Sequence, residues 1–136
     1  MAEEKKKLIQ FKNIVKSFED GQVVLKGVSL DIYENEFVTL LGPSGCGKTT
    51  TLRMIAGFES PDEGEIYLGG EPINALTPNK RDTAMVFQSY ALLPHYNIFD
   101  NVAYGLKLRH MDKATIKEKV TNILKLVGLE GMEARM

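Results

Sequence analysis

The sequence contains little that would place the chain outside a reducing, aqueous compartment. It has a single cysteine among 136 residues, so no disulfide can form within the chain, as is usual for cytosolic proteins. No apolar run approaches the roughly 20 residues needed to cross a bilayer. The first residues also lack the apolar stretch of a secretory signal peptide. We therefore expect a soluble, cytoplasmic protein.

An excess of positive charge is also missing. The chain carries 17 basic and 18 acidic residues, for a net charge of -1. Proteins that bind nucleic acids usually carry a strong basic patch, so we expect no nucleic-acid partner. A hydrophobic share of 43% and a charged share of 26% are those of an ordinary globular domain. The length suits one domain with one sizeable core.

Alternating apolar residues predict two strands near the start of the chain. Residues 8–14 and 24–32 both alternate between apolar and polar side chains, and a turn around Gly21 separates them. Alternation is typical of strands that bury one face only. We therefore expect an antiparallel sheet with one face exposed to water.

Two later segments have a different pattern. Residues 37–41 and 83–87 are almost continuously apolar, which favours strands buried on both faces of a parallel sheet. Between them, residues 49–56 have helical spacing and are followed by Gly57, a typical residue for ending a helix. Two further helices are expected towards the end. Asn97 or Asp100 would begin the first, and Asp112 would begin the second, which would end at Gly128.

A phosphate-binding motif lies between the first apolar run and its helix. The run Gly42-Pro43-Ser44-Gly45-Cys46-Gly47-Lys48-Thr49 fits G-x-x-x-x-G-K-[ST] at every fixed position. Glycines let the backbone curl until its N–H groups face phosphate oxygens. The lysine adds a positive charge, and the threonine hydroxyl is a hard ligand suited to Mg²⁺. A structural glycine turn is the alternative, but the flanking strand and helix favour the phosphate site.

This motif is part of a wider resemblance. The segments 42–50, 85–95 and 99–107 resemble the nucleotide-binding subunits of ATP-binding-cassette (ABC) importers, and the similarity runs from about Leu8 to the end of the chain. Within that family the spermidine/putrescine (polyamine) import ATPases look most similar. ATPases that import sugars, ferric ion or sulfate share much of the pattern.

The resemblance implies an α/β fold of the P-loop NTPase class, ABC type, present only in part. It implies an antiparallel β region at 1–36, a P-loop core at 37–89 and the start of a helical subdomain at 90–136. All three would belong to one nucleotide-binding domain.

The resemblance also assigns a site for ATP and Mg²⁺. Phe18 matches the aromatic residue that stacks on adenine, and Val24 would touch the nucleoside. Gln88 matches the glutamine that coordinates Mg²⁺ or orients a water, and Thr49 would be the second metal ligand. Lys48 and Gln88 would act in catalysis. The phosphates would lie on Gly42, Pro43, Ser44, Gly45, Cys46, Gly47, Lys48, Thr49 and Thr50. Without the resemblance, Phe18 reads equally well as a core residue and Gln88 reads as an ordinary surface residue.

The family further implies partners. A groove formed from the segment Tyr90 to Phe99 would receive a helix of a transmembrane permease. A second copy of the ATPase would complete a homodimer. The protein would then be peripheral on the cytoplasmic side of the membrane and would drive polyamine import.

Three elements that hydrolysis requires in this family are missing from the sequence. These are an LSGGQ-type signature, a hydrophobic strand ending in Asp-Glu, and a later switch histidine. We therefore expect the N-terminal part of a longer ATP hydrolase, and expect this part to bind nucleotide weakly and not to hydrolyse it. A related importer ATPase, a non-transport ABC ATPase and a small nucleotide kinase remain as alternatives.

Overall fold

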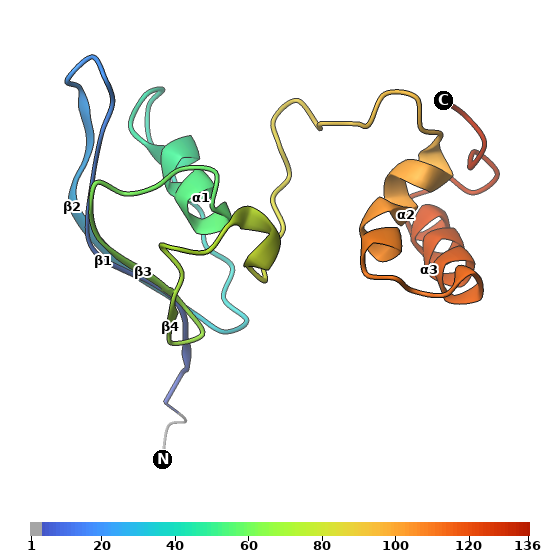
Figure 1. Ribbon diagram of the computed structural model, residues 1–136, viewed down its shortest axis with the longest axis horizontal. Helices are drawn as coiled ribbons and strands as arrows, with labels where there is room; N and C mark the ends of the chain where they lie inside the picture. The colour runs from blue at the N-terminus through green and yellow to red at the C-terminus, as the bar shows by residue number, and fades with distance from the viewer. Residues whose placement is uncertain (1–3) are drawn as a thin grey trace. The chain divides into compact units, whose positions relative to one another are not determined.

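The computed structural model describes residues 4–136 and divides them into two compact units. One unit ends at Met85, and the other runs from Val86 to Met136. The first contains a sheet with one helix against it, and the second contains a pair of helices (Figure 1). Among the described residues, no helix has the length and apolar character that a membrane crossing requires.

The sheet of the first unit has four antiparallel strands. They are β1 (Lys7–Ser17), β2 (Val23–Tyr33), β3 (Glu63–Leu68) and β4 (Glu71–Pro72), in the order β2-β1-β3-β4. The expected hairpin is therefore confirmed. Its turn depends on Gly21, which has a φ of 78° and donates its N–H to the Phe18 carbonyl over 2.8 Å.

The first helix, α1 (Lys48–Ala56), packs against the sheet and closes the core of this unit. Its position against the strands is visible in Figure 1. The buried side chains come from the helix, the strands and the segment after β4, and they are Phe11, Ile14, Leu25, Met54, Ile66 and Ile73. Gly57 ends α1 in the left-handed conformation, as predicted.

A buried arginine holds the C-terminal end of α1. Arg81 donates from one guanidinium nitrogen to the carbonyls of Met54 at 2.6 Å and Ile55 at 3.2 Å. Its Nε donates to the Leu76 carbonyl at 2.9 Å. Carbonyls at a helix C-terminus lack partners within the helix and carry partial negative charge, so a cation suits this position. Burial lowers the pKa of Arg81 from its ordinary value. A Cβ on Gly57 would lie 2.8 Å from this side chain, so glycine is required there for packing as well.

The second unit is built on α2 (Ile98–Leu108) and α3 (Lys113–Leu126). Asn97 accepts the N–H of Asp100 at 2.7 Å and so caps α2. Asp112 accepts the N–H of Thr115 at 2.9 Å and caps α3. The cap at Asp112 was predicted, and of the two candidates Asn97 and Asp100 for the first helix the structure has Asn97. The interface between the helices buries Ala103, Ile116, Val120 and Leu124.

The two predicted parallel strands are wrong for this structure. Residues 37–41 and 83–87 form no strand, and Phe37, Leu41 and Val86 are 94%, 95% and 86% exposed. A strand is stabilised by pairing with a neighbouring strand, and the sheet of the described residues includes neither segment. Their apolar side chains therefore lie in contact with solvent.

Arg81→Met should destabilise the chain by roughly 2–4 kcal/mol, because it keeps the bulk of the stem but leaves carbonyls at the end of α1 without a donor. Urea unfolding followed by circular dichroism measures this. Arg53→Met is the matched control, since Arg53 is an exposed residue of the same helix, and it should change stability by less than about 0.5 kcal/mol. Equal losses from both variants would contradict the role given to Arg81.

Candidate functional site

The glycine-rich loop before α1 has the backbone conformation that the motif predicts. Gly45 and Gly47 have φ values of 80° and 96°, and α1 begins directly afterwards at Lys48. The first turn of α1 carries no acidic residue and no side-chain cap. Its N–H groups and the positive end of its dipole are therefore available to an anion.

Packing leaves no room for a side chain at two glycine positions of the loop. A Cβ on Gly47 would lie 2.8 Å from Cγ1 of Val24 and 3.0 Å from Cδ2 of Leu25. A Cβ on Gly42 would lie 2.6 Å from Sγ of Cys46. The loop therefore closes on itself and on β2, while Gly45 has open space around it.

Lys48 binds the loop from which it projects. Its ammonium donates to the carbonyls of Gly42 at 2.5 Å and Pro43 at 2.7 Å, and it lies 3.3 Å from Sγ of Cys46. An ammonium has three donors, so these contacts use all of them. Phosphate oxygens that bind here would have to replace some of these partners.

The structure brings the predicted nucleotide residues together around one hollow of about 350 Å³. This volume lies within the range of small-molecule sites. The lining consists of Phe18, Gln22, Val24, Ser44, Gly45, Gly47, Lys48, Thr49 and Thr50. Gly42, Pro43 and Cys46 do not line it, but they contact Lys48 from within the loop.

Sequence reasoning missed Gln22 among these residues. Its carbonyl accepts the N–H of Phe18 at 3.1 Å, so the hairpin turn brings both residues to the hollow. The available signal was the turn at Gly21, which places the residues on either side of it next to each other.

The two predicted metal ligands lie in different units. Thr49 is exposed and lines the hollow, and its hydroxyl has no hydrogen-bond partner among the described residues. Gln88 is exposed and belongs to the unit that starts at Val86. No group of three acidic, histidine or cysteine side chains that could hold a metal occurs in residues 4–136. Mg²⁺ usually keeps several waters and takes oxygens from phosphates, so the chemistry of the Thr49 hydroxyl beside the candidate phosphate loop would suit this ion.

The predicted partner segment forms an apolar hollow of about 560 Å³ within the second unit. The lining includes Leu92, Leu93, Pro94, His95, Tyr96, Ile98, Asn101, Val102, Leu129 and Met136. Asn101 orders this segment. Its side chain accepts the Leu93 N–H at 2.8 Å and donates to the carbonyls of Tyr96 and Asn97, each at 3.1 Å.

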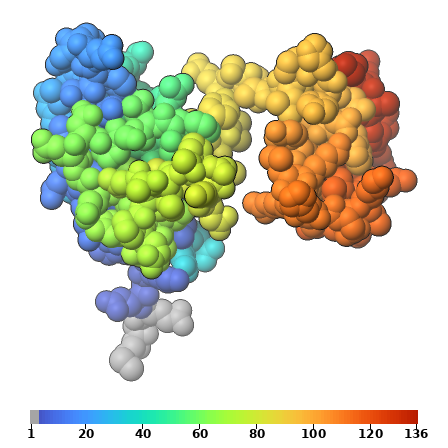
Figure 2. All heavy atoms as spheres, viewed as in Figure 1, coloured from blue at the N-terminus to red at the C-terminus, as the bar shows by residue number. Residues whose placement is uncertain are grey.

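The same segment holds strained and exposed residues. Tyr90, Ala91 and His95 have φ values of 62°, 51° and 74°, which are uncommon for residues with a side chain. Tyr90 is 79% exposed and Leu92 is 75% exposed. In Figure 2 this part of the chain is drawn in gold and lies on the surface. Such a contiguous apolar surface is typical of an interaction site.

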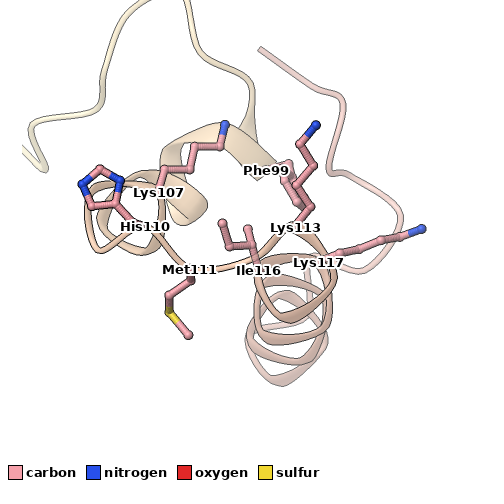
Figure 3. A pocket seen from close by; sticks show the side chains of 7 residues that line it. All are labelled: Phe99, Lys107, His110, Met111, Lys113, Ile116 and Lys117. Carbon is pink, nitrogen blue, oxygen red and sulfur yellow. The ribbon is translucent and has the colours of Figure 1, made fainter.

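A larger hollow of about 750 Å³ lies beside α2 and α3. It is lined by Phe99, Lys107, His110, Met111, Lys113, Ile116 and Lys117. In Figure 3 the three lysine side chains extend outward around Ile116. Lys107 is also paired with Asp100 at 2.5 Å. No glycine-rich loop leading into the N-terminus of a helix lines this hollow. It therefore lacks the features of a triphosphate site.

Comparing Gly47→Ala with Gly45→Ala distinguishes the free-energy cost of steric overlap from the cost of backbone strain. Each places a side chain in the left-handed region, which costs about 1–2 kcal/mol. Only Gly47→Ala also overlaps Val24 and Leu25, so it should lower the free energy of unfolding by roughly a further 1–3 kcal/mol. Urea titration of both variants measures the difference. Equal stability of the two would show that the loop does not depend on its contact with β2.

Comparison with known proteins gives curated relatives that resemble almost the whole chain. The spermidine/putrescine import ATP-binding protein PotA of Acetivibrio thermocellus is 56% identical over 132 residues, which are 97% of this chain and 37% of that protein. The PotA protein of Fusobacterium nucleatum is 57% identical over 125 residues, which are 92% and 33% of the two chains. The chain thus spans about a third of the length of these relatives.

Solved structures show the same fold. A dimeric structure of the ATP-binding cassette MJ0796 bound to ADP and Pi is 31% identical with a TM-score of 0.81, and the match covers 94% of this chain and 60% of that one. A second dimeric structure of MJ0796, described as a bacterial ABC transporter cassette, is 32% identical with a TM-score of 0.82. This match also covers 94% of this chain and 60% of that one. The fold is that of an ABC-type P-loop ATPase, of which this chain contains a part. The profile of ABC transporters matches residues 25–136, and the chain belongs to the ABC transporter family.

Proposed function

We propose that this chain supplies the nucleotide-binding part of an importer ATPase that couples ATP binding and hydrolysis to uptake of spermidine and putrescine. The observation that carries the proposal is the hollow in which the P-loop meets Phe18 and Val24. The polyamine substrate is supported by the printed names of relatives at 56% and 57% identity. ATPases of related importers, for sugar, ferric ion or sulfate, and non-transport ABC ATPases are the alternatives.

Each wall of the hollow has a role in this proposal. The α1 N-terminus and the P-loop bind the triphosphate, because unpaired N–H groups and the helix dipole favour an anion. Lys48 exchanges its loop carbonyls for phosphate oxygens and stabilises their charge. Phe18, 42% exposed at the edge of the hollow, stacks on the adenine, while Val24 contacts the nucleoside.

Thr49 would hold Mg²⁺ through its hydroxyl, with Gln88 as a second oxygen ligand in the assembled enzyme. The bound ion would offset the negative charge of the phosphates while the terminal phosphoryl group is transferred to water. Gln88 is proposed to orient the attacking water with its amide, which adds no negative charge near the phosphates. Its place at the beginning of the second unit would let it link phosphate occupancy to that unit.

The segment Tyr90 to Phe99, which lines the apolar hollow of the second unit, is proposed to receive a helix of a membrane permease. A second copy of the ATPase is proposed to complete the phosphate site, which would place the protein peripherally on the cytoplasmic face of the membrane. The sequence lacks the signature and the Asp-Glu strand end. We therefore propose that this chain alone binds nucleotide weakly and does not turn it over.

Calorimetric titration with Mg-ATP tests the phosphate site. Lys48→Ala should weaken binding by about tenfold or more, because it removes a charged hydrogen-bond donor. Lys26→Ala is the control, since Lys26 is exposed on β2 and does not line the hollow. Phosphate release should stay at the buffer level for both. Unchanged affinity in Lys48→Ala would refute the proposed phosphate site. ATP hydrolysis by the unmodified chain that Lys48→Ala abolishes would refute the proposal that the chain alone is inactive.

Uptake by cells that carry the gene tests the substrate. A chromosomal Lys48→Ala allele should lower entry of labelled spermidine and putrescine to the level of a gene disruption, because transport requires ATP at the P-loop. Sugar, sulfate and ferric ion uptake in the same cells serve as controls. Normal polyamine uptake together with loss of one of these would assign the protein to a related importer.

A further inference from the structure

Lys16 is a buried cation on the core face of β1. It is 9% exposed and lies opposite Leu25, a core residue of β2, in the strand pairing. Residues directly opposite each other in an antiparallel pair share one face of the sheet. Its ammonium lies 3.0 Å from a carboxylate oxygen of Glu59 and 3.3 Å from one of Asp62. Desolvation would lower the pKa of Lys16, but these two hydrogen-bonded carboxylates outweigh it and raise the pKa above its ordinary value.

A buried ion pair is weak evidence for a gain in stability. Replacing a buried ion pair by apolar side chains of similar size is often neutral or stabilising, because the charges must be desolvated. A charged residue among the core positions of β1 therefore needs another reason. The described neighbours of Lys16 provide one, since they lead to the candidate nucleotide site.

The Lys16 ammonium also lies 5.6 Å from the centroid of the Phe18 ring, within the range of a cation–π contact. The rest of the cluster fixes the chain beside this ring. Asp62 accepts the N–H of Ser17 at 2.6 Å and its hydroxyl at 2.9 Å, and the Asp62 N–H donates to the Val15 carbonyl at 2.8 Å. The segment after α1 thus holds both the strand end and the cation that faces the ring.

We propose that Lys16 is a positioning residue for nucleobase binding, held by Glu59 and Asp62 so that its ammonium covers one face of Phe18 and leaves the other face for a purine. This inference rests on the proposed function. A ring held in place before binding loses less freedom when a base stacks on it. A cation on one face also draws π-electron density towards itself, so the opposite face stacks better on an electron-rich base.

The test compares ATP with inorganic tripolyphosphate, which offers the same type of anion without a base. Lys16→Met keeps most of the bulk and removes the charge. It should lower ATP affinity about three- to fivefold and leave tripolyphosphate affinity unchanged. Lys16→Arg should keep the preference for ATP. In a Phe18→Ala background, Lys16→Met should have no further effect, because the ring through which it acts is gone.

Lys12→Met is the matched control. Lys12 belongs to the same strand and its ammonium lies 4.4 Å from the ring of Tyr67, but neither residue lines the hollow. Lys12→Met should change neither the affinity for ATP nor the affinity for tripolyphosphate. Thermal unfolding of each variant checks the fold. If Lys16→Met does not fold, Glu59→Gln removes one of the two carboxylates and should lower the ratio of ATP to tripolyphosphate affinity in the same direction.

A second measurement needs no ligand. The chain contains no tryptophan, so Phe18→Trp introduces a single reporter at the site. Lys16→Met in that background should increase quenching by acrylamide and lower the fluorescence anisotropy of the ring, whereas Lys12→Met should not. Increased quenching without any nucleotide binding would keep the positioning role and reject the proposed function. Equal losses for ATP and tripolyphosphate, or unchanged quenching, would overturn the role of Lys16.

Discussion

Gly47 has no room for a side chain, because Val24 and Leu25 of β2 approach the position where a Cβ would lie. Its φ of 96° also turns the backbone directly into the first residue of α1. One residue therefore sets where the phosphate loop meets the sheet and where the helix begins. Val24 lines the hollow, and the next residue, Leu25, belongs to the core. The contact of Gly47 with β2 therefore fixes both the packing of the core and the geometry of the candidate site.

Features with a local cause could be predicted from the sequence. The P-loop, the hairpin turn at Gly21 and the caps at Asn97 and Asp112 each depend on contacts within a few residues. The strands expected at 37–41 and 83–87 would depend on pairing with distant strands, and the sheet of the described residues includes neither segment. Their apolar composition identified segments that need burial, but composition does not supply the hydrogen-bond partner.

The same distinction explains which parts of the site sequence patterns alone do not indicate. Phe18 came from family resemblance, and only the folded hairpin places it with Gln22 and Val24 at the P-loop. Lys16 has a weak local signal, namely a cation at an alternate position with Ile14, but Glu59 and Asp62 lie far along the sequence. A buried charge becomes interpretable only when its partners are known. Gln88 stays a prediction, because its role concerns both units.

The two ends of α1 have different partners, both within the first unit. Phosphates at the N-terminus of α1 would act on a helix whose other end is bound by Arg81. Arg81 also donates to the Leu76 carbonyl, so it joins the end of α1 to the segment that follows β4. A displacement of α1 along its axis would therefore disturb hydrogen bonds to a buried cation. These cannot lengthen at low cost, because the carbonyls would lose their donors. Glycine at position 57 leaves room for this contact, since a Cβ there would lie 2.8 Å from Nε of Arg81.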